Sequence, residues 1–184
     1  TPVPEKHRVE VVPKVKQSAR RERRAEYRRR AEEAFQAGRH AEAFEALRQT
    51  LLDGERDDRL AFSLYECGRR ARLFEPLRET LTDLLRRRPR WAAVHAVLGM
   101  VLHDQGQLAE AEQHYLRARK LKFAAEVLDI AICGLFIDTG RPELAVQIAR
   151  QGLKKWPNSV DLNYRLGLAS FRLGRKKESV QALQ

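Results

Sequence analysis

Apolar residues recur at helical spacing along most of the chain after about residue 17, among helix formers such as Ala, Arg, Glu and Leu. No stretch shows the sustained alternation of apolar and polar residues that is typical of a half-buried strand. Short connections between helices favour stacked antiparallel pairs. The pattern predicts ten helices, over residues 18–37, 40–53, 58–71, 74–88, 91–105, 108–120, 124–139, 141–155, 159–173 and 175–183.

The first 17 residues, TPVPEKHRVEVVPKVKQ, differ in composition from the rest of the chain and contain Pro2, Pro4 and Pro13. Proline fixes its own φ and biases the residue before it towards extended backbone. We therefore expect two parts, an extended N-terminal segment over 1–17 and a helical domain over 18–184.

Glycines recur at a fixed interval in the helical part. Gly106, Gly140 and Gly174 are 34 residues apart, and the same frame extends back to Arg72 and Gly38. A glycine here ends the first helix of a pair, where left-handed backbone is favoured. The residue five positions after each turn is small in four of the five repeats, which lets two helices approach closely. These residues are Ala43, Leu77, Ala111, Ala145 and Ser179.

The segments LGMVLHDQGQLAEAEQHYLRA (98–118) and LGLASFRLGRKKES (166–179) show the repeat most clearly. They resemble the tetratricopeptide repeat family, whose period is 34 residues. The resemblance implies an all-α fold, a right-handed α-solenoid of antiparallel helix pairs that stack because no unit buries its apolar face alone. The repeats would span 24–57, 58–91, 92–125, 126–159 and an incomplete 160–184. The chain departs from the family at Arg30, where a large apolar residue is usual, and at Arg72, which replaces the turn glycine.

In this family the first helix of each pair lines a concave surface, so the resemblance implies a groove for an extended or helical peptide. The first two repeats present charged and aromatic side chains there, among them Arg28 and Glu32, and the last three present mainly apolar ones. Some of these side chains can instead pack as core between neighbouring helices. The candidate partner-binding residues are Phe35, Phe62, Glu66, Arg69, Met100, His103, Ile130, Ile137, Tyr164, Leu168 and Phe171.

Charge suggests an alternative partner. The 184 residues hold 36 Lys and Arg against 25 Asp and Glu, for a net charge of +11. Such an excess favours an anionic partner, such as nucleic acid or an acidic membrane surface, although an arginine run also serves as a solvated cap of a repeat array. The densest cluster supplies the candidates for an anionic partner: Arg20, Arg21, Arg23, Arg24, Arg28 and Arg29.

Catalytic and metal-binding motifs do not stand out in the sequence. We find no phosphate-binding loop, no dinucleotide fingerprint, no G-x-S-x-G, no H-E-x-x-H and no C-x-x-C, and the five histidines lack the spacing of metal ligands. Cys67 and Cys133 occupy first helices two repeats apart, too far for a disulfide, so we expect free thiols. These features predict a protein that is not an enzyme and has no cofactor and no metal site.

Taken together, the sequence predicts a non-catalytic scaffold or adaptor for a protein or peptide partner. A regulatory or targeting module of a larger multidomain protein is the other possibility, and the ends at Thr1 and Gln184 favour a fragment. The incomplete last repeat would leave an apolar face at the C-terminal end, which suggests a homodimer. Few cysteines and no leader favour the cytoplasm, or the periplasm or a membrane surface if an upstream leader or anchor is missing.

Overall fold

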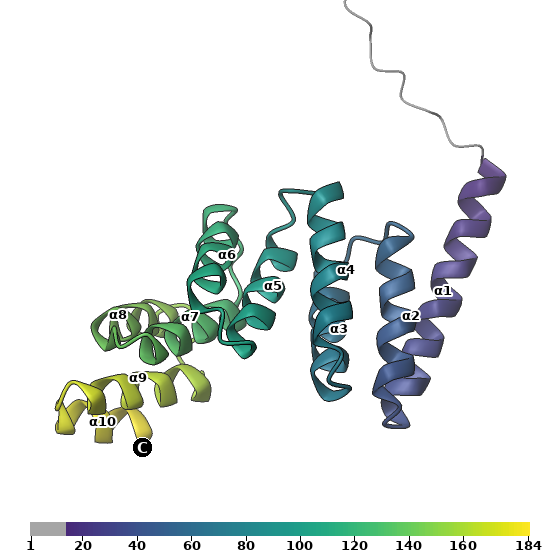
Figure 1. Ribbon diagram of the computed structural model, residues 1–184. Coiled ribbons are helices and arrows are strands. Elements are labelled where there is room, and N and C mark those ends of the chain that lie inside the picture. The colour runs from purple at the N-terminus through teal and green to yellow at the C-terminus, as the bar shows by residue number, and fades with distance from the viewer. Residues whose placement is uncertain (1–13) are drawn as a thin grey trace, which may run out of the picture. The chain divides into compact units, whose positions relative to one another are not determined.

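A computed structural model describes the backbone of residues 14–184 and the side chains from Ser18 onward (Figure 1). This part of the chain contains helices and no strand, which confirms the predicted all-α fold class. None of these helices is both long and apolar enough to cross a membrane. The helices are α1 (Lys14–Gln36), α2 (His40–Leu52), α3 (Asp58–Arg70), α4 (Phe74–Arg87), α5 (Ala92–Asp104), α6 (Leu108–Lys120), α7 (Glu126–Asp138), α8 (Pro142–Leu153), α9 (Val160–Arg172) and α10 (Lys176–Leu183).

Helix α1 begins four residues earlier than the sequence predicts. It starts at Lys14 rather than Ser18, directly after the last proline of the N-terminal segment. Proline disfavours helix in the residue before it but is tolerated at a helix start, so nothing in the residues after Pro13 prevents helix. The extended conformation predicted for 1–17 is therefore wrong for 14–17, and for 1–13 it lies outside the described residues.

The chain divides into two compact units, one up to Ala71 and one from Arg72 to Gln184. In the first unit, α2 packs against both α1 and α3. The buried side chains include Ala43, Phe44 and Leu51 from α2 and Leu64 from α3. A three-helix unit is thus built around α2, which presents apolar residues to two neighbours.

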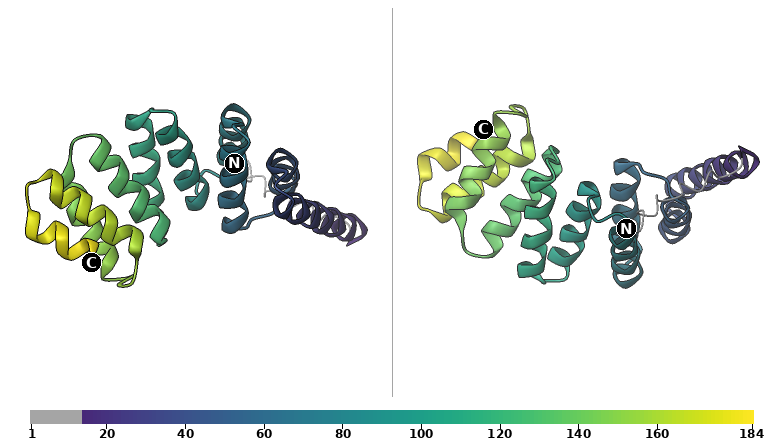
Figure 2. Two further views of the ribbon diagram at one scale, coloured as in Figure 1. Left: turned by 90° about the horizontal axis from the view of Figure 1, so that it is seen from below. Right: turned by 90° about the horizontal axis from the view of Figure 1, so that it is seen from above.

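The second unit contains α4 to α10, and each helix from α5 onward packs against the next in the chain (Figure 2). The first helices of successive pairs also contact one another, α5 with α7 and α7 with α9. Trp91, Tyr115, Leu128, Leu135 and Leu162 are fully buried between these layers. Each pair thereby covers the apolar face of its neighbour, as expected of a stacked repeat.

The predicted turn column adopts left-handed backbone at every position. Its glycines, Gly38, Gly106, Gly140 and Gly174, have φ of 73°, 75°, 69° and 70°. Arg72 takes the same conformation with φ of 58°, although a side chain there is strained. All five positions therefore share the left-handed turn geometry, and at one of them an arginine, Arg72, replaces the glycine that suits this backbone.

We expect Arg72→Gly to stabilise the protein by about 1 kcal/mol, because glycine removes the steric cost of left-handed backbone. Urea unfolding of the two proteins side by side measures this gain. Arg70→Gly is the matched control, since Arg70 lies within α3, where glycine costs about 1 kcal/mol relative to a good helix former. An Arg72→Gly variant as unstable as Arg70→Gly would contradict the account of this turn.

Candidate partner-binding site

A groove of about 760 Å³ opens in the first unit, lined by residues of α1, α2 and α3 and of the turn before α3. Its floor contains the buried side chains of Ala31, Leu47 and Cys67. Two aromatic rings line it, Phe35 from α1, which is 41% exposed, and Phe62 from α3, which is half-buried. An apolar floor lined by accessible aromatic rings, one exposed and one half-buried, is the kind of surface that anchors a partner side chain.

Most of the groove residues predicted for the first two repeats line this one hollow. They are Phe35, Phe62 and Glu66, together with Arg28 and Glu32. Arg69 is not in the lining, but its guanidinium is 3.1 Å from a carboxylate oxygen of Glu66. Helical periodicity explains why these residues line the same groove. Arg28, Glu32 and Phe35 share one face of α1. Phe62 and Glu66 share one face of α3.

Charges at the groove are held mainly in intramolecular pairs. Glu66 accepts from Arg70 and Arg69, and the hydrogen bond from Arg70 is the main reason why the pKa of Glu66 lies below its usual value. Arg28 bridges Glu55 at 2.9 Å and Asp57 at 3.4 Å. Because these charges already have partners within the chain, we expect the apolar residues of the groove to contribute most of the binding free energy.

Two predicted groove residues of the second unit are packed as core. Met100 of α5 is 8% exposed, and Ile137 of α7 is 3% exposed. The first helices α5, α7 and α9 contact one another, so these side chains fill the space between helices rather than face solvent. As exposed anchors for a partner, Met100 and Ile137 are therefore excluded.

Aromatic side chains on α9 remain accessible in the second unit. Tyr164 is 53% exposed and Phe171 is 65% exposed, while Ile130 and Leu168 are half-buried. His103 lies at the end of α5 with its Nε2 2.9 Å from Asp138 Oδ2. Of the groove residues predicted for this unit, the most exposed therefore lie on α9.

Arg165 is a candidate that the sequence analysis missed. A methyl group added at Gly134 would lie 3.4 Å from Arg165 Nη1 and 3.6 Å from His103 Cε1, so both side chains lie over the backbone of α7. Within residues 14–184, Arg165 has no carboxylate partner within ion-pair distance. The available signal was a charged residue in a repeat column that holds Ser63, Val97 and Ala131 in the three preceding repeats, although Arg29 stands there in the first.

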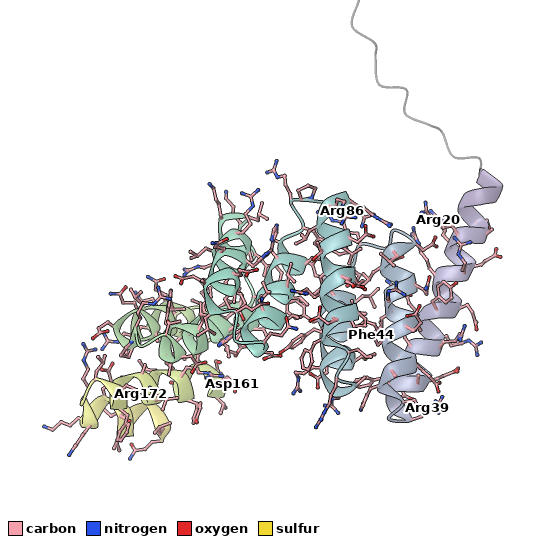
Figure 3. The ribbon with its side chains drawn as sticks, in the orientation of Figure 1. Arg20, Arg39, Phe44, Arg86, Asp161 and Arg172 are labelled. Atoms are coloured by element: carbon pink, nitrogen blue, oxygen red, sulfur yellow. The ribbon has the colours of Figure 1, made fainter. Side chains whose placement is uncertain are left out.

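Most of the arginines considered for an anionic partner are bound to carboxylates of this chain. Arg20 lies on the side of α1 towards α2 (Figure 3) and contacts Asp53 at 3.3 Å. Arg23 contacts the same carboxylate at 2.6 Å. Arg24 reaches Asp53 and Glu55, and Arg28 reaches Glu55 and Asp57. Arg29 pairs with Glu26 and Glu33, whereas Arg21 is exposed. This cluster thus ties α1 to the acidic turn between α2 and α3.

We expect Asp53→Asn to destabilise the protein by about 1 kcal/mol at neutral pH, a modest loss because the arginines are about half exposed. Burial alone would raise the pKa of Asp53, but hydrogen bonds from Arg23 and Arg20 outweigh it, so this pKa lies below its ordinary value of 3.8. A carboxyl whose pKa is lowered on folding stabilises the folded state above that value and loses the effect in acid.

Urea unfolding of wild type and Asp53→Asn at several pH values tests this assignment. The difference between them should be largest near pH 7, shrink below about pH 4 and fall with added salt. A difference that is independent of both pH and salt would show that Asp53 acts by packing and not by its charge.

Both cysteines are buried and free, as the sequence predicts. Burial raises the pKa of Cys67 to about 11 and that of Cys133 to about 12. Because the thiolate is the reactive form, neither thiol is suited to nucleophilic chemistry. Within the described residues no group of three or more His, Cys, Asp or Glu could hold a metal ion.

Comparison with known proteins decides the family. A family model described as tetratricopeptide repeat matches residues 78–125 and 135–184, more than half of the chain. The chain belongs to the tetratricopeptide repeat family. Tetratricopeptide repeat proteins are in general non-catalytic scaffolds that bind other proteins, and this chain has the fold of such a scaffold. A search of curated proteins finds no match to the sequence.

Solved structures of other repeat proteins share this tetratricopeptide fold. PilF of Pseudomonas aeruginosa aligns with a TM-score of 0.73 at 17% identity, over 89% of this chain and 75% of PilF. The thermophilic protein TTC0263 of Thermus thermophilus aligns at 0.67 and 18%, over 86% and 87% of the two chains. The MamA protein aligns at 0.66 and 16%, over 88% of each. At this level of identity the likeness shows the fold alone.

Proposed function

We propose that this tetratricopeptide repeat protein binds a segment of a partner protein in the groove between α1 and α3. The observation that supports this most directly is the 760 Å³ hollow itself, with an apolar floor and with the rings of Phe35 and Phe62 in its lining. A pocket of several hundred Å³ has room for large side chains, and aromatic residues dominate the energy of protein interfaces. The expected partner segment is amphipathic, with large apolar anchors.

Electrostatics also favours a protein partner over nucleic acid. Arg20, Arg23, Arg24 and Arg28 already contact the carboxylates of Asp53, Glu55 and Asp57. Binding to phosphate would require these pairs to be exchanged, which reduces the gain from counterion release. The exposed aromatic side chains of α9, Tyr164 and Phe171, form a second candidate surface for an apolar part of the partner.

Capture from a lysate of the source organism, followed by mass spectrometry, tests the proposal. Wild type, Phe62→Glu and the control Leu116→Glu should be compared, each first checked for folding by circular dichroism. Leu116 is 48% exposed on α6, so the control adds the same charge away from the groove and from α9. The proposal expects a protein retained by wild type and by the control but lost with Phe62→Glu. Retention by all three proteins would refute the groove as its binding site.

A further inference from the structure

We propose that His95 and His114 form a proton-controlled latch between α5 and α6, which a single shared proton closes at neutral pH and which opens when both rings are protonated. The two side chains come from the two helices of one pair, and their Nδ1 atoms lie 3.0 Å apart, at hydrogen-bond distance. Both residues are half-buried. The latch lies in the second unit and is independent of the groove proposed for the partner.

The second ring nitrogen of His95 decides which histidine donates. Nε2 of His95 lies 3.1 Å from the carbonyl oxygen of Pro89, which can only accept a hydrogen bond, so Nε2 carries the proton of the neutral ring. Nδ1 of His95 is then an acceptor, and Nδ1 of His114 donates to it. Because Pro89 lies in the connection between α4 and α5, the two hydrogen bonds join α6, α5 and that connection.

One additional proton fits without breaking the latch. Nε2 of His114 makes no hydrogen bond within the described residues and is the one ring nitrogen outside the two hydrogen bonds. A proton bound there leaves Nδ1–H of His114 donating to His95. The donor is then charged, and a charge-assisted hydrogen bond is stronger than a neutral one.

The charged groups that face the latch come from α4 and α6. Those that line a second groove beside His114 are Arg78, Glu79, Arg86 and Glu110. Both arginines are paired with carboxylates of α4, so the charges left unpaired there among the described residues are negative and favour a proton on His114. The charge that acts on His95 is that of Arg117 on α6, which opposes its protonation. The first additional proton therefore binds His114.

A second proton opens the latch. It has to bind Nδ1 of His95, because the other three ring nitrogens already carry hydrogen. Two N–H groups of two imidazolium rings would then face each other across 3.0 Å. Burial is the main reason why the pKa of each ring lies below its usual value, and the charge of His95 lowers that of His114 further. The folded pair therefore resists the second proton.

This resistance makes the stability of the second unit depend on pH. In the unfolded chain each histidine binds a proton below about pH 6.5, whereas the folded pair with a closed latch holds one of the two. The folded state thus binds fewer protons, so stability is highest above pH 6.5 and falls as the pH is lowered. At pH 5.0 the missing proton should reduce the folding equilibrium constant about thirtyfold.

Urea unfolding at pH 7.5 and pH 5.0, followed by tryptophan fluorescence, tests the latch. Both tryptophans, Trp91 and Trp156, belong to the second unit, so the signal reports on that unit. His114→Gln and His95→Gln should each lose most of the thirtyfold effect, because the conflict needs two imidazolium rings. His40→Gln, which removes a histidine of the first unit, should retain it. If each of the two latch variants keeps half of the wild-type effect or more, the rings titrate independently and the latch is refuted.

Nitrogen-15 NMR of the wild-type protein gives a result that does not depend on how a variant folds. At pH 7.5 we expect a protonated Nε2 in His95, a protonated Nδ1 in His114 and a scalar coupling between the two Nδ1 nuclei across the hydrogen bond. The coupling should disappear as the second proton binds in acid. Unprotonated Nδ1 atoms in both rings at pH 7.5, without a coupling between them, would overturn the proposal. Neither experiment bears on partner binding, which is measured in a different unit of the chain.

Discussion

Replacing Phe35 and Phe62 together by alanine is expected to weaken binding of the partner at least about a hundredfold. Truncation of an aromatic anchor in a desolvated pocket typically costs about 2 kcal/mol or more, and each 1.4 kcal/mol is a factor of ten in affinity. The two rings lie on different helices, α1 and α3, and both line the groove above its floor of Ala31, Leu47 and Cys67. Removing both takes away most of the aromatic surface that a partner can contact there.

Isothermal titration with the partner identified by capture measures this loss. The control is Leu116→Ala with Leu144→Ala, which also shortens two exposed apolar side chains but on α6 and α8. Binding by the control should equal that of wild type. If the phenylalanine variant, folded by circular dichroism, binds within threefold of wild type, the aromatic pair does not anchor the partner.

Gly99→Ala is expected to destabilise the second unit by about 2 kcal/mol, although alanine normally stabilises a helix interior by about 1 kcal/mol relative to glycine. A β-carbon at Gly99 would lie 2.6 Å from both Cδ1 and Cε1 of Tyr115 and 3.2 Å from the carbonyl oxygen of Ala111. Tyr115 is fully buried, so its ring has little room to move. Overpacking of this kind costs more than the gain in helix propensity.

Gly134→Ala is the matched control for this prediction. Gly134 lies inside α7, and the nearest atom to an added β-carbon there would be Arg165 Nη1 at 3.4 Å, an ordinary contact. Its free energy of unfolding should equal or exceed that of wild type by up to about 1 kcal/mol. Equal effects of the two substitutions in urea unfolding would contradict the close packing of α5 on α6 at Tyr115.

The repeat frame was predictable because it depends on local backbone requirements. A residue that ends a helix in left-handed conformation recurs every 34 positions, and even Arg72, where glycine is absent, has the predicted conformation. The five small or apolar positions that follow these turns are likewise all buried. The period predicts these turns and buried positions because every repeat packs against its neighbours in the same way.

Side-chain environments were less predictable, because they depend on neighbours distant in sequence. Phe35 and Ile137 occupy the same position in their first helices, three repeats apart, yet Ile137 is packed between helices while Phe35 is exposed beside an open groove. The arginines of α1 form a positive run in the sequence, and only folding shows that the acidic turn at Asp53 lies against them. Contact between His95 and His114 likewise requires the pairing of α5 with α6.

Site-specific photo-crosslinking tests the central claim most directly. A photoreactive amino acid at Ser63, an exposed residue of α3 that lines the groove, should crosslink the captured partner. The same amino acid at Ala41, exposed on α2 and outside the groove lining, should not. Mass spectrometry of the product should identify one amphipathic segment attached at position 63. Crosslinks formed at position 41 but not at 63 would contradict the assignment of this groove as the partner-binding site.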